Sequence, residues 1–443
     1  MNVILPIVSG LLAYVVFPSV NWYPLAFIFL APFFVFIIRE KSFWKLALGT
    51  IFFRFAYGLA LAPYIFDLAL YAQSIAVFWG FTIAVHFFKK IGFREEINLT
   101  AIGTFYLIFD FLQSRYTLIP AYPINLGVAL GLSPFVGLAK LGGLPVLSAF
   151  LVITNILAAA AWQKLSPKKI LTALTAVILA ATIASPLLPR SVEGNREFKF
   201  ASISTDFSFD DESAGHRQQM NKISESLGVG RYDLVIFPES LFNLEISESD
   251  KSSLELHSAL AKELKTKILA NVVFKKADGD YNANLLIDEK GEIIGEYEKT
   301  DLIYGTEYWP EWAKLYGKTG MFNRGQLSPV MSLGNDLKIA SPICFESHRP
   351  GRMREFADSG ADIIINSSSN KWIRGFGSRG LDRYLGETLA LRRIYSVWLG
   401  KPIIISGRGD YAGVITPDGE YEVLDFQNAE RYTIYKGTIK YNY

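Results

Sequence analysis

The sequence predicts a multi-span α-helical membrane bundle over residues 1–190 and an α/β domain over residues 197–443. Long apolar stretches dominate the first part, and short β-branched runs alternate with helix-length segments in the second. Residues 1–190 carry thirteen Lys+Arg against five Asp+Glu, whereas the remaining 253 residues carry thirty-one against thirty-seven. A basic, apolar half joined to an acidic half indicates a membrane region followed by a water-exposed domain.

Seven apolar stretches in the first half approach the roughly 20 residues that cross a bilayer. They lie near residues 2–17, 23–38, 46–66, 68–88, 98–114, 142–161 and 170–187. The loops after the second, fourth and sixth stretches contain nine Lys and Arg residues, against two in the alternate loops. The positive-inside rule then places the amino terminus in the cytoplasm and everything after residue 190 outside it.

Two ionisable residues, Arg54 and Asp110, lie inside these predicted spans. Charged side chains in such segments usually face the interior of a helix bundle or a polar cavity. We therefore expect a polar contact between helices, a side chain that extends to the membrane interface, or a direct contact with a substrate.

The second half alternates strands with helices, which predicts an α/β domain with covered sheets. Strand-like runs are "FKFASIS", "DLVIFPE", "KILANVVF", "NANLLID", "GEIIGEYE", "LKIASPICF", "ADIIINSS" and "PIIISG". Helix-length segments cover residues 213–227, 251–265, 350–359 and 379–398. The stretches "DEKGEI" and "TPDGEY" carry turn residues typical of hairpins.

Several classes of site are disfavoured by composition. No basic patch with interleaved aromatic residues stands out, so nucleic acid is not an expected partner. The four histidines are scattered and the chain has one cysteine, so neither a metal site nor an intramolecular disulfide is expected. The sequence predicts no cofactor.

Three reactive residues follow three of the predicted strands. Glu239 lies in "LVIFPESLF", Lys299 in "GEYEKTDLIYGTEYW" and Cys344 in "LKIASPICFE". Each has an ordinary structural explanation, because a lone cysteine is often a small buried apolar residue and single charges often start helices or lie in loops. Active-site groups of α/β folds, however, gather at the carboxyl ends of strands.

Together these residues supply the groups that acyl transfer needs. A thiol attacks a carbonyl as thiolate, so it requires a base such as the Glu239 carboxylate. The resulting oxyanion requires a positive donor, which the Lys299 ammonium provides.

The stretches "FPES", "YEKTDLIYGTEY" and "ICFE" resemble the three motifs of the nitrilase, or carbon–nitrogen hydrolase, superfamily. With the multi-span first half, the chain is most similar to the apolipoprotein N-acyltransferase family. The stretch "NWYPLAFIFLAPFFVFI" resembles that family's second span. The resemblance implies an α-β-β-α sandwich in the periplasm, attached to a multi-pass domain in the bacterial inner membrane.

The resemblance also implies roles. Cys344 takes an acyl chain from a phospholipid as a thioester and passes it to the α-amino group of an S-diacylglyceryl-cysteine apolipoprotein. Glu307, in "GTEY", and Glu346, in "CFE", are implied as accessory active-site residues. Asn282, in "YNANLLID", and Trp372, in "SNKWIRG", are implied to bind substrate.

Aromatic residues gather in "IYGTEYWPEWAKLYG", where Tyr304 and Trp309 are further candidates for substrate contact. They serve either ordinary packing or a lid at the membrane interface, where tryptophan and tyrosine concentrate.

The chain departs from the family in several stretches, among them "STDFSFDDES", "SNKWIRG" and "LRRIYSVWLG". These departures affect expected pocket walls and lid loops rather than the three catalytic residues. A membrane-tethered amidase or nitrilase that hydrolyses its acyl-enzyme therefore stays open as an alternative. An inactive relative that only binds lipid or lipoprotein is disfavoured by the intact Glu-Lys-Cys set.

Overall fold

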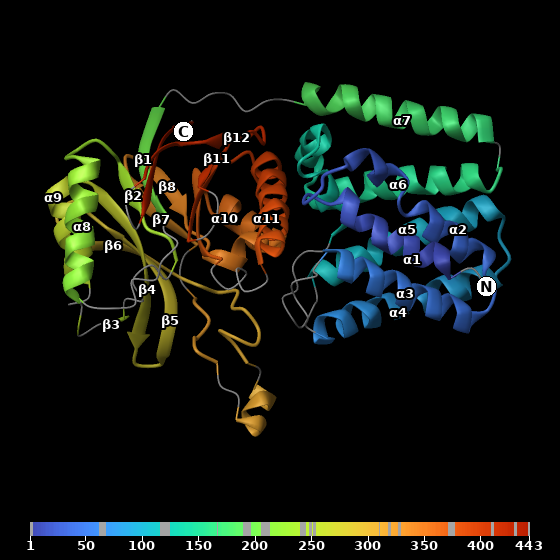
Figure 1. Ribbon diagram of the computed structural model, residues 1–443, viewed down its shortest axis with the longest axis horizontal. Helices are drawn as coiled ribbons and strands as arrows, with labels where there is room; N and C mark the ends of the chain where they lie inside the picture. Colours follow the sequence, from blue (N-terminus) through green and yellow to red (C-terminus); the bar gives the residue numbers. More distant parts are fainter. Residues whose placement is uncertain are drawn as a thin grey trace. The chain divides into compact units, whose positions relative to one another are not determined.

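The computed structural model describes most of the chain, with gaps at several loops. The described residues are 3–61, 68–115, 125–165, 167–188, 196–204, 213–239, 245–247, 250, 254–309, 311–317, 320–326, 329–370, 377–408, 412–428 and 432–441. They form two compact units (Figure 1). The first unit contains residues 1–189 and 376–398, and the second contains residues 190–375 and 399–443.

The first unit is helical. Its α-helices in the described residues are α1 (Ile4–Val16), α2 (Ala31–Arg39), α3 (Phe43–Leu61), α4 (Leu68–Lys90), α5 (Glu95–Arg115), α6 (Leu144–Trp162), α7 (Pro167–Leu187) and α11 (Gly377–Leu399). Short 3-10 helices are η1 (Tyr23–Phe27), η2 (Leu126–Leu130) and η3 (Pro134–Leu141). The seven predicted apolar stretches thus become helices, and about seven helices precede the α/β region.

One expected helix is interrupted. The stretch 23–38 forms η1 followed by α2, with a break between Phe27 and Ala31. Pro32 lies in the first turn of α2, where its missing N–H needs no partner, whereas inside a continuous helix it would remove a backbone hydrogen bond.

Helix α11 belongs to the helical unit, although its residues fall within the range expected for the α/β domain. The Arg383 guanidinium donates from Nε to the Leu61 carbonyl at the end of α3, 2.9 Å away. It also lies over the ring of Tyr14 in α1, 5.0 Å from the centroid. The chain therefore returns to the helical unit after most of the α/β unit is complete.

Two helices among the described residues are long and apolar enough to cross a membrane, Leu144–Trp162 and Lys168–Leu187. Helix α1 has 13 residues, about 20 Å of helix, which is shorter than the roughly 30 Å hydrocarbon core. Arg54 of α3 is buried in this unit and donates to Ser74 and Gln113, at 2.7 and 2.9 Å.

The second unit contains two β-sheets in its described residues. The larger, eight-stranded sheet has the order β13-β14-β1-β2-β4-β5-β6, with β3 paired to β4. Its strands are β1 (Arg196–Ser204), β2 (Leu234–Ile236), β3 (Glu245–Ser247), β4 (Lys267–Lys276), β5 (Gly279–Ile287), β6 (Ile293–Glu298), β13 (Asp425–Asn428) and β14 (Thr433–Tyr441).

The smaller, six-stranded sheet has the order β12-β11-β10-β9-β8-β7 in the described part of the chain. Its strands are β7 (Val330–Gly334), β8 (Leu337–Ala340), β9 (Ile363–Ser369), β10 (Ile403–Arg408), β11 (Gly413–Ile415) and β12 (Tyr421–Val423). Both expected hairpins form, because β5 pairs antiparallel with β6 and β11 pairs antiparallel with β12.

The two sheets face each other, and helices cover their outer faces. Helices α8 (Ser213–Leu227) and α9 (Glu255–Leu264) pack on the larger sheet around one apolar core. Helix α10 (Pro350–Asp358) connects β8 to β9 of the smaller sheet, and its Met353 and Phe356 are fully buried. Between the sheets, Asn284 of β5 donates to Ser341 and to Ser367 of β9, at 2.6 and 2.9 Å. This arrangement is the expected α-β-β-α sandwich.

Candidate active site

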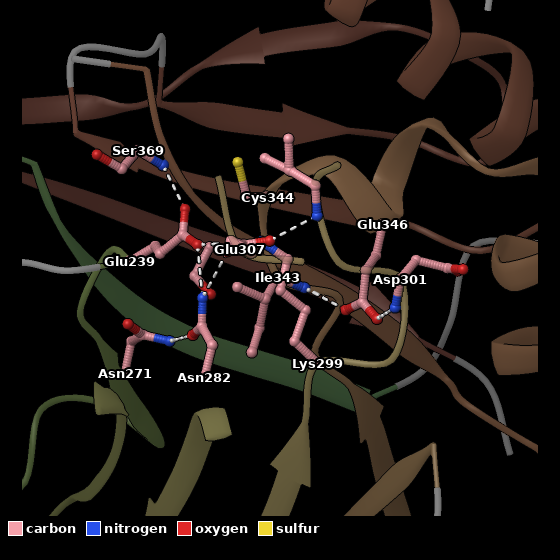
Figure 2. A network of polar contacts seen from close by, with 12 residues as sticks. Glu239, Asn271, Asn282, Lys299, Asp301, Glu307, Ile343, Cys344, Glu346 and Ser369 are labelled. Carbon is pink, nitrogen blue, oxygen red and sulfur yellow. Dashed lines mark hydrogen bonds and ion pairs between the residues drawn. The ribbon is translucent and has the colours of Figure 1, made fainter. Parts of the chain in front are cut away.

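Lys299 lies at the centre of the polar cluster in Figure 2. It directly follows β6, and its side chain is completely buried. Its Nζ lies 2.7 Å from Oε1 of Glu307 and 3.4 Å from Oε1 of Glu239. Burial alone lowers the pKa of Lys299, but the carboxylates of Glu239 and Glu307 outweigh burial and raise this pKa above its ordinary value. The side chain therefore stays a cation at neutral pH.

Glu239 lies three residues beyond β2 and is buried. Its Oε2 accepts a hydrogen bond from the backbone N–H of Ser369, at the end of β9, at 3.0 Å. Its Oε1 accepts a second hydrogen bond from the Asn282 amide at 3.0 Å. Groups from both sheets therefore hold this carboxylate in place.

Glu307 reaches the same cluster from the loop after Lys299. Its Oε1 accepts from Lys299 and, at 3.3 Å, from the Asn282 amide. Its Oε2 accepts from the Ile303 backbone N–H at 2.9 Å, which closes the loop around it. Glu307, which the resemblance implied as an accessory residue, thus shares the cation with Glu239.

Cys344 lies four residues beyond β8, at the first position of the 3-10 helix η6 (Cys344–His348). Its φ of +51° is in the left-handed region, which a side-chain-bearing residue adopts at a cost. The side chain is buried, and Figure 2 shows its sulfur beside Glu239 and Glu307. Burial and the two glutamates raise the pKa of Cys344, and the Lys299 ammonium opposes them. The resting side chain is therefore a protonated thiol.

Asn282 lies within β5 and connects the two carboxylates. Its Nδ2 donates to Glu239 and Glu307, while its Oδ1 accepts from Nδ2 of Asn271 at 2.8 Å. Both ends of this amide are therefore engaged within the protein. The geometry favours a role in orienting the carboxylates over the substrate contact that the resemblance implied.

Glu346 is buried but directs its carboxylate away from the Lys299 cluster (Figure 2). Its Oε2 accepts from the Ile343 N–H at 2.9 Å. Its Oε1 accepts from the Thr300 and Asp301 N–H groups at 2.8 and 3.1 Å, and from the hydroxyl of Tyr297 at 2.7 Å. It therefore joins the residues after Lys299 to the residue before Cys344.

The aromatic candidates lie on a projecting arm. Residues 300–326 extend from the α/β unit as the gold and orange loop of Figure 1. Tyr304 and Trp309 pack together, with ring centroids 5.3 Å apart. Leu315 and Tyr316 are 85% and 75% exposed. Trp372 lies outside the described residues.

Two parts of the cluster were not expected from the sequence, the Ser369 N–H and Asn271. A backbone donor has no residue-type signature, so nothing in the sequence indicates the first. Asn271 could have been recognised, because its side-chain amide interrupts the apolar part of the predicted strand "KILANVVF". Buried polar side chains require partners, so such a residue indicates a paired group on a neighbouring strand.

Taken together, a buried thiol, two carboxylates and a buried ammonium form a site suited to acyl transfer. Among the described residues, no group of three or more His, Cys, Asp or Glu side chains could hold a metal ion. The chemistry that the cluster supports is nucleophilic attack by sulfur with proton transfer to a carboxylate.

Comparison with known proteins agrees with this chemistry. The profile of the carbon–nitrogen hydrolase family matches residues 210–378. A Geobacter metallireducens protein named apolipoprotein N-acyltransferase is 24% identical over 410 residues, covering 83% of this chain and 77% of that protein. A Bradyrhizobium formamidase is 30% identical over 149 residues, covering 32% of this chain and 41% of that protein.

Among solved structures, Saccharomyces cerevisiae Nit3, of branch 10 of the nitrilase superfamily, matches 57% of this chain and 93% of its own at 16% identity and a TM-score of 0.44. The relative from Geobacter metallireducens matches across both the helical and the α/β units, whereas the formamidase matches about a third of this chain. The chain is therefore similar to the apolipoprotein N-acyltransferases over most of its length, as a divergent relative, and its residues 210–378 match the carbon–nitrogen hydrolase family.

Proposed function

We propose that this protein is an apolipoprotein N-acyltransferase. It moves an acyl chain from a phospholipid, through a thioester on Cys344, to the amino group of an S-diacylglyceryl-cysteine lipoprotein. The observation that carries the proposal is the buried Lys299 ammonium held between Glu239 and Glu307 beside the only thiol of the chain.

The first half-reaction forms the thioester. Glu239 takes the proton of the Cys344 thiol as the sulfur attacks the ester carbonyl of the phospholipid. Lys299 stabilises the negative charge on the carbonyl oxygen, and its raised pKa keeps it a cation throughout. The intermediate then collapses, the ester C–O bond breaks, and the lysophospholipid alkoxide leaves with the proton from Glu239.

The second half-reaction returns the enzyme to its starting state. The free α-amino group of the lipoprotein cysteine attacks the thioester carbonyl and forms the amide bond. Glu239 accepts a proton from the attacking nitrogen, and the Cys344 sulfur leaves and is reprotonated. Electrons and protons balance without a cofactor, since the acyl group only moves from oxygen to sulfur to nitrogen.

The membrane supplies the donor, so the helical unit is proposed to span it with the α/β unit outside the cytoplasm. Helix α7 supports a membrane-spanning role for the helical unit, because only 11% of its apolar stretch is buried within the protein. Leu171, Leu179, Ile183 and Leu187 are all more than half exposed. So large an apolar face is stable against lipid tails rather than water.

A second function, hydrolysis of the acyl-enzyme by water, is favoured by the match to the formamidase. Both functions share the thioester and differ in what reaches it. A transferase must exclude water from Cys344 until the amine arrives. The buried Cys344 sulfur is consistent with such exclusion.

An assay with phospholipid carrying a tagged acyl chain separates the two functions. We expect the tag to appear as an amide on a diacylglyceryl-cysteine peptide, with little free fatty acid when the peptide is omitted. Rapid release of free fatty acid without the peptide would instead establish the hydrolase. Cys344→Ala serves as the control for acyl loss that does not involve the site.

A further inference from the structure

A chain of three asparagine amides lies behind the two glutamates. Strands β4 and β5 pair antiparallel, and Asn271 lies directly opposite Asn284. The next residue of β4, Val272, lies opposite Ala283, which follows Asn282 in β5. Alternate β4 residues, Ala270 and Val272, face the apolar core under α8 and α9. Asn271 therefore faces the space between the two sheets, where its amide meets the amides of β5.

Asn271 is the donor to both of the other amides, and Figure 2 shows its hydrogen bond to Asn282. Asn271 Nδ2 donates to the Asn282 Oδ1 at 2.8 Å and to the Asn284 Oδ1 at 3.1 Å. It also lies 3.1 Å from the carbonyl oxygen of Ala283. Asn284 in turn directs its own Nδ2 to Ser341 and Ser367. All three amides are at least 93% buried, so exchange with bulk water does not offer them other partners.

The carboxylates set the direction of these hydrogen bonds. An ionised carboxylate only accepts hydrogen bonds, so Asn282 must present its NH₂ to Glu239 and Glu307. The carbonyl of Asn282 then points the other way and requires a donor, which is the NH₂ of Asn271. A donor at position 271 is thus required for the orientation of an amide that touches both carboxylates.

We propose that Asn271 is a positioning residue that holds the Asn282 amide with its N–H groups on Glu239 and Glu307. If the Asn282 amide turned by half a rotation, its carbonyl oxygen would face both carboxylates and repel them. Among the described residues, the groups that face Glu239 besides Asn282 and the Ser369 N–H are Lys299, Glu307 and Cys344. Without the amide N–H, the two glutamates share one cation and bind a proton more readily.

The test replaces the donor and keeps the shape. Asn271→Asp is nearly isosteric but presents acceptors where Asn282 requires a donor. We expect it to slow acyl transfer at pH 7 about tenfold or more, the loss typical of one hydrogen bond to a charged group. We also expect the acid side of the pH–rate profile to move to higher pH. Asn271→Leu, which removes the donor without adding a charge, should reproduce the loss if the aspartate variant fails to fold.

Leu269→Ala is the matched control. Leu269 lies on the same strand and face, two residues from Asn271, and is fully buried, but it carries no polar group. This variant should lose stability without moving the pH–rate profile. An equal shift in Leu269→Ala would mean that general packing, rather than the amide, controls the site.

A double-mutant cycle tests the route through Asn282. In an Asn282→Ala background, Asn271→Asp should cause little further loss, because the amide that it orients is gone. Additive losses, or a folded Asn271→Asp protein with the wild-type rate and profile, would overturn the inference.

The inference rests on the proposed function for its lipid assay, so a lipid-free measurement is needed beside it. Alkylation of Cys344 by iodoacetamide requires proton transfer from the same thiol but no acyl donor. Asn271→Asp should slow it while Leu269→Ala does not. If the wild-type protein moves no acyl chain but this contrast holds, only the proposed function fails. If the contrast is absent, the inference fails whatever the lipid assay gives.

Discussion

At the scale of single residues, the conformation of Cys344 is the most unusual feature of the cluster. Its φ of +51° presents the sulfur at a sharp turn between β8 and η6. Strained backbone of this kind persists where the surrounding structure enforces it and often accompanies a reacting side chain. Here, the Glu346 carboxylate bonded to the Ile343 N–H and the Asn366 amide, 3.0 Å from the Pro342 carbonyl oxygen, hold the turn.

The strain predicts an order of stability between two inactive variants. Glycine adopts a positive φ freely, whereas alanine keeps most of the cost. After allowance for the greater chain entropy of glycine when unfolded, Cys344→Gly should be about 0.5–1 kcal/mol more stable than Cys344→Ala. Thermal unfolding of both variants in one detergent measures this. An alanine variant that melts higher would show that the turn is not strained.

The protonation state of Cys344 gives a second prediction. Burial and the two glutamates raise the pKa of Cys344. Its thiol therefore holds its proton more tightly than a free cysteine thiol, whose pKa is about 8.5. Ultraviolet difference spectra between wild type and Cys344→Ala should therefore show no thiolate below about pH 9. A thiolate that titrates below pH 8 would indicate a preformed ion pair with Lys299 rather than proton transfer during attack.

At the scale of elements, Glu346 connects two loops that carry separate reactive groups. Its carboxylate accepts hydrogen bonds from the backbone N–H groups of Thr300, Asp301 and Ile343. Glu346→Gln places an amide N–H among these donors, and buried donors that lose their acceptor each cost about 1–3 kcal/mol. We expect the variant to lose about 2–4 kcal/mol of stability and most of its activity.

Glu355→Gln provides the control for this prediction. Glu355 pairs with Arg352 at 2.5 Å but is 51% exposed, so its loss should be nearly neutral. Parallel denaturation of the two variants gives the comparison. A Glu346→Gln protein as stable and active as Glu355→Gln would mean that the two loops hold their positions without this carboxylate.

The strands and helices near the cluster were largely predictable from the sequence, because strong local patterns produced them. The eight β-branched runs and the "DEKGEI" and "TPDGEY" turns all form as expected. Strands β3, β7, β13 and β14 were not predicted. The first three have three to five residues, too few for a periodic signal, and the nine residues of β14 mix polar and apolar side chains. The break in 23–38 was also missed, although Pro24 and Pro32 indicate it.

The cluster itself was predictable only in part. Glu239, Lys299, Glu307 and Cys344 were found through short motifs, and the structure brings them together. Which way the Asn282 amide points, and which loops Glu346 joins, depend on pairing between strands distant in sequence. The register between β4 and β5 determines the orientation of the Asn282 amide. The packing of the two sheets against each other brings the Ser369 N–H to Glu239. Neither strand register nor packing between the sheets can be inferred from the sequence around a single residue.

At the scale of the whole molecule, a basic helical unit and an acidic α/β unit share one chain. The charge count between the helices predicts that the α/β unit lies outside the cytoplasm, with nine basic residues on one side and two on the other. A reporter that works only outside the cytoplasm, fused after Tyr443, should be active in cells. The same reporter fused after Lys169, in a loop predicted to lie in the cytoplasm, should be inactive. The opposite pattern would reverse the orientation and remove access to lipoproteins outside the cytoplasm.

The central claim is that Cys344 carries the acyl chain. Intact-protein mass spectrometry after incubation with a phospholipid of defined acyl composition tests it most directly. We predict a mass increase equal to one acyl group, located on Cys344, removed by hydroxylamine as a thioester and absent from Cys344→Ala. Acyl transfer to a diacylglyceryl-cysteine peptide by a protein that never carries the chain on Cys344 would contradict the account.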